Sequence, residues 1–231
     1  PNLNDTLTIL KNLETTDVDM IEIGFPYSDP LADGPVIQES SGQAIENGMT
    51  LHLLFEQLQS LRNITQKPII LMGYLNVVLQ FGEQKFIEKC AEVGVDGIII
   101  PDMPLHYYLS NFKAFCERNQ VSNVLLITPE TSEERIKYLD SLSSGFLYAV
   151  SSSSTTGNEN KEVKNDEYLN KLASINLKNP VMIGFGIKNK TDFEQVTEKS
   201  QGGIIGTAFV KILLENKDWK EKAEAFIKSI K

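Results

Sequence analysis

Seven apolar runs of strand length recur along this chain, and segments with helical periodicity separate them. The runs are rich in Ile, Val and Leu and show little strict alternation, which is typical of parallel strands covered by helices. They lie at 19–24, 68–74, 97–101, 123–129, 145–151, 180–186 and 202–208. This pattern predicts an α/β fold built from repeated strand–helix units.

Helices are predicted between the runs because apolar residues recur at helical spacing. Leu7, Leu10 and Leu13 follow Asn4 or Asp5, either of which suits a helix cap. Further helices are predicted at 51–61, 86–91, 109–116, 133–142, 167–175 and 192–196, with two more from Phe209 onward. Strand and helix therefore alternate throughout.

The repeat length, roughly 25 to 45 residues without a break in composition, predicts one domain over residues 1–231. A closed eight-stranded barrel and a doubly wound open sheet both fit this alternation. No GxGxxG turn follows the first run, and the chain opens with a helix where a barrel would have a strand. We infer a barrel whose first strand is missing from the N-terminus.

Charge and composition exclude several classes of function. The net charge of −9 argues against nucleic acid or an anionic membrane surface as a partner. The uncharged apolar stretch 68–82 is shorter than the roughly 20 apolar residues that cross a bilayer, so no transmembrane helix is expected. An anionic ligand would have to be held by local groups.

Cysteine and histidine are too sparse for a metal centre. Cys90 and Cys116 lie in helical segments without CxxC spacing, and the chain has only His52 and His106. We therefore expect no metal site and no disulfide, with both cysteines as buried thiols in a reducing compartment. Catalysis would then depend on carboxylates.

A buried acidic residue is predicted near the end of the first run. In a strand, Glu22 shares a face with Met20 and Gly24 and points away from Ile21 and Ile23. If the isoleucines pack on helices, Glu22 points inward, where desolvation raises a carboxyl pKa toward the range useful for acid–base catalysis. A structural carboxylate satisfied by backbone amides is the alternative.

The loop after this strand is stiff and acidic. Pro26, Pro30 and Pro35 fix φ and reduce the mobility of a loop that presents Asp29 and Asp33. Asp33 stands in Ala-Asp-Gly-Pro, just before a helix whose first turn begins at Pro35. Both a catalytic carboxylate and a helix-cap or turn aspartate fit this position.

Glycine turns end the last two runs, at Gly184 and Gly186 and again at Gly206. Exposed backbone amides at such ends attract phosphate without a lysine, and barrels commonly bind phosphate in the loops after their last two strands. Helix dipoles can hold a phosphate even in an acidic chain. Glycines also end strands for steric reasons, which is the alternative.

Two other features lie after strands. The polar segment 151–166 fits either a disordered surface loop or a lid that closes over a site. Tyr74 and Tyr148 suit the wall of a pocket for a flat apolar substrate, and core packing explains each of them equally well.

Taken together, these motifs resemble the alpha subunit family of tryptophan synthase over nearly the whole chain. The segment from Glu22 to Gln38 is close to diagnostic. The other matching motifs are Tyr74-Leu-Asn76, Ile99-Ile-Pro-Asp-Met-Pro104, Thr156-Gly157, Gly184-Phe-Gly-Ile187 and Gly206-Thr-Ala-Phe-Val-Lys211.

The resemblance implies a (β/α)8 TIM barrel that acts in tryptophan biosynthesis. It would cleave indole-3-glycerol phosphate by retro-aldol chemistry to indole and glyceraldehyde 3-phosphate. Glu22 would be the general acid–base, which protonates the indole ring carbon and accepts the proton of the side-chain hydroxyl. Asp33 would hold the indole N–H and stabilise the developing cation.

The resemblance also implies the binding residues. Tyr74 and Tyr148 would line the site, and Thr156 matches a lid threonine that reaches Asp33 on closure. The implied phosphate ligands are Gly184, Phe185, Gly186, Gly206 and Thr207.

A beta subunit is the implied partner, in an α2β2 heterotetramer. The docking surface would include Asp29, Pro30, Asn76 and Pro104. No cofactor is required by the alpha subunit, because pyridoxal phosphate belongs to the beta subunit. A cytoplasmic location is expected.

Two departures from the family pattern leave rival hypotheses. Ser152 stands where many members have a lid arginine, and Ser154 replaces the following glycine. Together with the missing strand, this allows a catalytically silent alpha-like subunit that serves as a partner of beta. A different phosphate-binding barrel, such as an isomerase or an indole-3-glycerol phosphate synthase relative, is less favoured because the strands contain no lysine.

Overall fold

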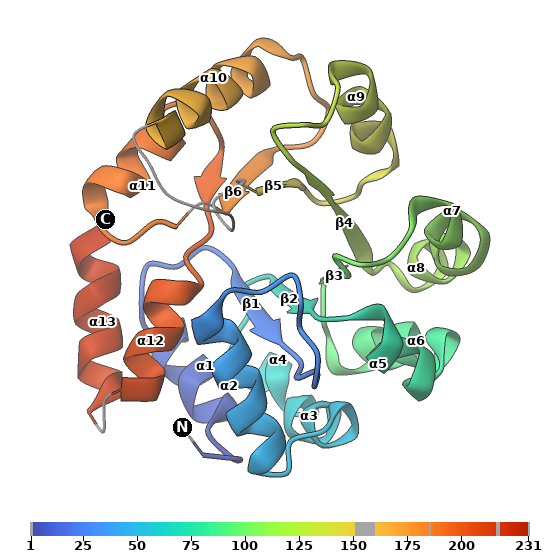
Figure 1. Cartoon of the computed structure of the whole chain (residues 1–231). Helices are drawn as coiled ribbons and strands as arrows, with labels where there is room; N and C mark the ends of the chain where they lie inside the picture. Colours follow the sequence, from blue (N-terminus) through green and yellow to red (C-terminus); the bar gives the residue numbers. More distant parts are fainter. Residues whose placement is uncertain (1, 151–159, 185, 216–217, 231) are drawn as a thin grey trace. The chain divides into compact units, whose positions relative to one another are not determined.

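The computed structural model describes residues 2–150, 160–184, 186–215 and 218–230 (Figure 1). They form two compact units in which strands and helices alternate along the chain. Unit 1 comprises Pro1–Asn123 and Val210–Lys228, and unit 2 comprises Val124–Phe209 and Ser229–Lys231. The prediction of one domain over residues 1–231 stays a prediction.

All seven predicted strands are present, and each is shorter than its apolar run. They are β1 (Ile21–Gly24), β2 (Ile69–Met72), β3 (Gly97–Ile99), β4 (Ser122–Ile127), β5 (Leu147–Val150), β6 (Val181–Gly184) and β7 (Gly202–Gly203). The strand of the last run is the shortest, and helix α12 (Thr207–Glu215) already begins inside that run. The apolar runs thus predict where strands occur better than where they end.

Helices fill the intervals between the strands. Unit 1 contains α1 (Thr6–Glu14), α2 (Pro35–Glu46), α3 (Leu51–Leu58), α4 (Leu61–Ile64), α5 (Leu75–Phe81), α6 (Glu83–Val93), α7 (Leu105–Tyr107), the π-helix η1 (Tyr108–Phe112) and α8 (Lys113–Asn119). Unit 2 contains α9 (Glu133–Leu142), α10 (Asn160–Ser174) and α11 (Lys190–Thr197). The chain closes with α12 and α13 (Trp219–Ile230), the two final helices that were predicted.

Two predictions about helix starts need correction. Asp5 precedes α1, but its side chain does not cap the helix, because it accepts hydrogen bonds from Asn2 N and Nδ2, both at 2.9 Å. The segment 151–166 is also not a loop throughout, since α10 begins at Asn160. Residues 151–159 lie outside the described part of the chain, so the lid prediction stays untested.

In unit 1 the strands pair in parallel, so their carboxyl ends meet at one edge. Gly24 of β1 lies opposite Met72 of β2, which lies opposite Ile99 of β3. Pairing continues just beyond the strands, because Phe25 N donates to Met72 O at 2.9 Å and Gly73 N donates to Ile99 O at 3.1 Å. The loops that follow β1 and β2 therefore start side by side.

Phenylalanines from separate helices form the core of unit 1. The Phe86 ring of α6 lies 5.8 Å from the ring of Phe55 and 5.8 Å from that of Phe25, which follows β1. Phe55 also contacts Phe81 of α5 at 5.3 Å. All four side chains are buried, so this cluster ties the start of the loop after β1 to the helical layer.

Unit 2 continues the parallel arrangement through β5, β6 and β7. Leu147, Ala149 and Ile183 point into its core and are fully buried. At the amino end of β6, the Asp140 carboxylate of α9 accepts hydrogen bonds from the backbone N–H groups of Lys178 at 2.6 Å and Asn179 at 2.9 Å. Because this acid satisfies backbone donors, it has a structural explanation.

The expectation of two buried thiols is confirmed in the described residues. Cys90 on α6 and Cys116 on α8 are free, buried thiols. Within these same described ranges, no helix is long and apolar enough to cross a membrane.

Candidate active site

Glu22 lies in β1, two residues before the edge where the strands of unit 1 end. Glu22 is accessible to solvent, although a buried acidic residue was predicted, and its neighbour Ile21 is buried, so the two side chains alternate as predicted. Desolvation by the surrounding protein, together with the negative charge of Asp33, raises the pKa of Glu22 to about 7. Water thus reaches a carboxyl that is nevertheless surrounded by protein, and this carboxyl exchanges its proton near neutral pH.

Asp33 lies in the loop between β1 and α2, and its carboxylate is held by a tyrosine. The Tyr74 hydroxyl donates a hydrogen bond to Asp33 Oδ2 at 2.9 Å. Burial raises the pKa of Asp33, and the hydrogen bond from Tyr74 opposes this effect. The cap interpretation is wrong, because Gly34 precedes α2 and no side chain caps that helix.

The Asp33 loop is folded back on itself and fastened to α2. Asp33 N donates to Pro30 O at 3.0 Å, and Leu31 N donates to Asp29 O at 2.9 Å. Gln38, on the first turn of α2, donates from Nε2 to Asp33 O at 2.8 Å. These hydrogen bonds hold the part of the loop from Asp29 to Asp33, in addition to the stiffness that its prolines provide.

Tyr74 follows β2, and its side chain is only 7% exposed. Its hydroxyl also accepts a hydrogen bond from Ala32 N at 3.1 Å. The Tyr74 ring lies 5.1 Å from the ring of Tyr27, whose backbone N and O both bond Ser41 Oγ on α2. The meeting of Tyr74 with Asp33 follows from the parallel pairing of β1 and β2, which places both loops at one edge.

Glu22, Asp33 and Tyr74 together form an acid–base group within unit 1. A carboxyl with a pKa of about 7 can both donate and accept a proton at neutral pH. A second carboxylate beside it can stabilise positive charge that develops on a substrate. Two such carboxyls can divide the roles of proton transfer and charge stabilisation.

The residues predicted to dock a partner are also placed on unit 1. Asp29 lies in the loop after β1, Asn76 in the first turn of α5, and Pro104 immediately before α7. Leu31, beside Asp29 and Pro30, is 81% exposed, the largest value among the exposed large apolar residues of the described chain. Leu31 was not among the predicted contact residues, although an apolar residue in an acidic, proline-rich loop was a signal for a contact surface.

The two glycine turns lie side by side in unit 2. Ile183 of β6 pairs with Gly203 of β7, and Ile204 N donates to Ile183 O at 2.8 Å. Gly184 ends β6, and α12 begins at Thr207 directly after Gly206. The turns after both strands therefore leave the same edge, and the first-turn N–H groups of α12 are free of helical partners there.

Steric packing explains only one of these glycines. A Cβ on Gly184 would lie 2.6 Å from Tyr148 Cζ, so the tyrosine ring of β5 requires glycine at this position. A Cβ on Gly186 or Gly206 would meet nothing within 4 Å. Packing therefore gives no reason for glycine at these two open positions. Close approach of a ligand to the backbone gives such a reason.

Two predicted residues fall outside the described part of the chain, namely Phe185 and the lid residue Thr156. The same holds for Ser152 and Ser154, the departures from the lid pattern. Their predicted roles stay predictions.

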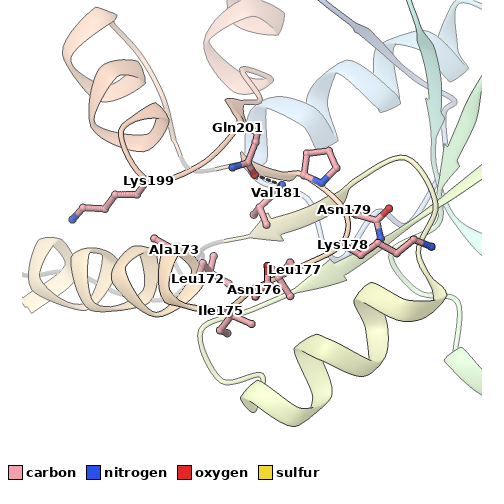
Figure 2. A pocket seen from close by; sticks show the side chains of 11 residues that line it. Leu172, Ala173, Ile175, Asn176, Leu177, Lys178, Asn179, Val181, Lys199 and Gln201 are labelled. Carbon is pink, nitrogen blue, oxygen red and sulfur yellow. Dashed lines mark hydrogen bonds between the residues drawn. The ribbon is translucent and has the colours of Figure 1, made fainter.

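A cavity of about 350 Å³ lies in unit 2 (Figure 2). It opens at the amino ends of β6 and β7, the opposite end of the strands from Gly184. The side chains that line it include Leu172, Lys178, Lys199 and Gln201, and Gln201 Oε1 accepts a hydrogen bond from Val181 N at 2.8 Å. None of the predicted catalytic residues lines this cavity, so we do not assign it to the reaction.

Comparison with known proteins identifies the family. The model of the tryptophan synthase alpha chain family matches residues 1–230. The chain belongs to the tryptophan synthase alpha chain family. An alpha chain from Flavobacterium psychrophilum is 55% identical over 94% of this chain and 86% of that protein. One from Parabacteroides distasonis is 48% identical over 100% of this chain and 90% of that protein.

Solved alpha-chain structures share the fold. The tryptophan synthase A-subunit of Pyrococcus furiosus matches with a TM-score of 0.88 at 31% identity, covering 99% of this chain and 94% of that chain. A chain from the tryptophan synthase complex of the same organism matches with a TM-score of 0.86 at 30% identity, covering 99% and 93%. The predicted (β/α)8 TIM-barrel class is thereby confirmed. The described residues contain seven of the eight strands of such a barrel, and the first strand is the one predicted to be missing.

Proposed function

We propose that this alpha chain cleaves indole-3-glycerol phosphate to indole and glyceraldehyde 3-phosphate, with Glu22 and Asp33 as its catalytic residues. The observation that carries the assignment is the raised pKa of Glu22, about 7, beside an Asp33 carboxylate that Tyr74 holds in place. Family membership supports the reaction, and this local environment supports the choice of residues.

Glu22 performs both proton transfers. Its carboxyl protonates the indole ring carbon that bears the glycerol phosphate side chain. The resulting carboxylate then accepts the proton of the adjacent side-chain hydroxyl. As that oxygen becomes an aldehyde carbonyl, the carbon–carbon bond breaks and its electron pair returns to the ring. Proton and electrons balance within the substrate and Glu22, so the proposed reaction requires no cofactor.

Asp33 accepts a hydrogen bond from the indole N–H. When the ring carbon is protonated, positive charge develops toward the nitrogen, and a nearby carboxylate stabilises that charge. This stabilisation is greatest in the transition state, because the ground-state indole is neutral.

Phosphate binding is assigned to the glycine turns of unit 2. Backbone N–H groups at Gly184, Gly186 and Gly206, with the Thr207 hydroxyl at the start of α12, suit a phosphate monoester. Phe185 is included from the family pattern. Tyr148, whose ring lies against Gly184, is proposed to line the substrate site beside this turn.

A beta subunit is the proposed partner, in an α2β2 heterotetramer. One of the matching structures is a tryptophan synthase complex, and the exposed Leu31 beside Asp29 and Pro30 gives the proposed docking surface an apolar residue to bury. Asn76 and Pro104 are assigned to the same surface. Pyridoxal phosphate is placed in the partner, and a cytoplasmic location is proposed from the biosynthetic role of the family.

The proposed function is tested by incubating the purified chain with indole-3-glycerol phosphate and measuring released indole, alone and with added beta subunit. We expect measurable turnover alone and faster turnover in the complex. If indole is absent under both conditions while the chain still binds beta, the chain is a silent structural partner and the proposed reaction is wrong.

Replacement of Leu31 is expected to weaken the complex. Leu31→Ser removes the apolar side chain from the proposed interface, and loss of a buried leucine side chain corresponds to about 1.5–3 kcal/mol, or about 10- to 100-fold in affinity. Calorimetric titration with beta subunit measures the change. Ile45→Ser is the matched control, since Ile45 on α2 is 40% exposed but lies outside the proposed surface. Equal affinities for both variants would contradict this docking surface.

A further inference from the structure

The hydroxyl of Tyr74 contacts two consecutive residues of the Asp33 loop. It accepts a hydrogen bond from Ala32 N at 3.1 Å and donates one to Asp33 Oδ2 at 2.9 Å. A tyrosine that only lines a pocket with its ring needs neither bond. We propose that Tyr74 is a positioning residue for the reaction, whose hydroxyl orients the Asp33 carboxylate toward the indole nitrogen. This inference rests on the proposed function.

The two oxygens of Asp33 are used differently. Tyr74 donates a hydrogen bond to Oδ2. Within the described ranges, no residue donates a hydrogen bond to Oδ1. A carboxylate accepts through both oxygens, so Oδ1 keeps its capacity for a substrate N–H. With Oδ2 held, rotation of the carboxylate about its last bond is restricted, and the free oxygen points in one direction.

The position of Tyr74 is set by β2, by the segment after β3 and by the first part of the loop that contains Asp33. Leu75 N donates to Asp102 Oδ1 at 2.8 Å, which connects the start of α5 to the segment after β3. The Tyr74 ring also packs on Tyr27. The hydroxyl is therefore presented from a fixed point, as a positioning group requires.

Charged groups around Tyr74 keep it a donor. Burial raises the pKa of Tyr74, and the carboxylates of Asp33 and Asp102 raise it further, while Ala32 N–H lowers it. Glu22 on β1 interacts with Asp33, whose charge raises the pKa of Glu22. The phenol thus stays protonated at neutral pH and does not compete with Glu22 for proton transfer.

A second loop contact provides a matched control. Gln38 Nε2 donates to the backbone oxygen of Asp33 at 2.8 Å, so it fixes the loop without touching the carboxylate. Removal of this bond by Gln38→Met loosens the loop at the same residue. Removal of the Tyr74 hydroxyl by Tyr74→Phe keeps the ring and frees the carboxylate.

Steady-state kinetics of both variants test the proposal. For Tyr74→Phe we expect kcat to fall about 10- to 100-fold, the effect of losing a hydrogen bond to a charged group, with KM changed less than about threefold. The acid limb of the kcat pH profile should move to higher pH, because the lost bond had favoured ionised Asp33. For Gln38→Met we expect less than about threefold change in kcat and no movement of the acid limb.

Three outcomes would overturn the proposal. Wild-type kcat and an unchanged pH profile in Tyr74→Phe would show that the hydroxyl is dispensable. An equal loss in Gln38→Met, with no pH shift in either variant, would show that both residues only anchor the loop. Carboxyl NMR titration of Asp33 gives a readout without turnover, and an Asp33 pKa that does not rise in Tyr74→Phe would also contradict it. Absence of indole release by the wild-type chain, in contrast, counts against the proposed function itself.

Discussion

Indole formation is expected to fall at least about 1000-fold when Glu22 is replaced by glutamine. The amide has nearly the same shape as the carboxyl but can neither protonate the ring carbon nor accept the hydroxyl proton, and general acid–base catalysis contributes about 10²- to 10⁴-fold per transfer. Because Glu22 performs both transfers in the proposed mechanism, kcat should be affected far more than KM. The measurement is indole release under single-turnover and steady-state conditions. Activity within about tenfold of the wild-type chain would remove Glu22 from its catalytic role.

The same variant tests the pKa of Glu22 through stability. The pKa of Glu22 is raised from 4.5 to about 7 in the folded chain, so between these pH values the folded state binds a proton that the unfolded state has released. The free energy of unfolding therefore loses a contribution from Glu22 as pH rises from about 4.5 to about 7, and the loss is complete above that window.

Glu22→Gln lacks this titration. Its free energy of unfolding, measured relative to that of the wild-type chain, should therefore be higher at pH 8 than at pH 4. A pKa change from 4.5 to about 7 corresponds to about 3 kcal/mol, which solvent access to Glu22 reduces to on the order of 1–2 kcal/mol. Urea unfolding of both proteins at the two pH values measures this. A pH-independent difference would contradict the raised pKa. The unfolding transitions themselves show whether the variant folds.

Asp33→Asn is expected to lower kcat about 100- to 1000-fold, the usual effect of removing one group that stabilises transition-state charge. The amide oxygen can still accept the Tyr74 hydrogen bond, so the loop should keep its geometry while its negative charge is lost. The charge of Asp33 also raises the pKa of Glu22, and its removal should lower that pKa. Indole release and the pH profile of kcat together measure both effects.

Asp29→Asn is the matched control for this charge. Asp29 lies on the same loop, and its backbone oxygen accepts from Leu31 N at 2.9 Å, but it belongs to the proposed docking surface. Turnover of the isolated Asp29→Asn chain should stay within about twofold of the wild-type value. If both variants lose turnover equally, the effect is a general charge effect of the loop, and the specific role of Asp33 is wrong.

The strand positions and the location of the acidic residues could be predicted from sequence. Apolar runs predicted all seven strands, and two-residue alternation placed Glu22 on the face opposite buried Ile21. The helix α5 was not predicted, because its segment Leu75–Phe81 is almost continuously apolar or amide and shows no clear periodicity. The start of α10 was missed for the opposite reason, since its first turns are polar and resemble a loop.

Asp33 illustrates where local reasoning fails. Its place just before Gly34 and Pro35 fits a helix cap, and a cap residue and a catalytic residue are identical at the level of sequence. The carboxylate instead bonds Tyr74, 41 residues further along the chain. Only the parallel register of β1 and β2 brings these residues together, and register is a long-range property that periodicity does not contain.

By itself, the sequence determined the family, the strand–helix alternation and the identity of the acidic and glycine residues. The tertiary structure decided their environments: a pKa of about 7 for Glu22, the hydrogen bond that holds Asp33, and the packing of Tyr148 against Gly184. The physical reason is that desolvation, charge coupling and side-chain hydrogen bonds depend on distances between segments far apart in sequence. Local patterns place residues on strands and loops, whereas strand pairing determines which of their polar atoms meet.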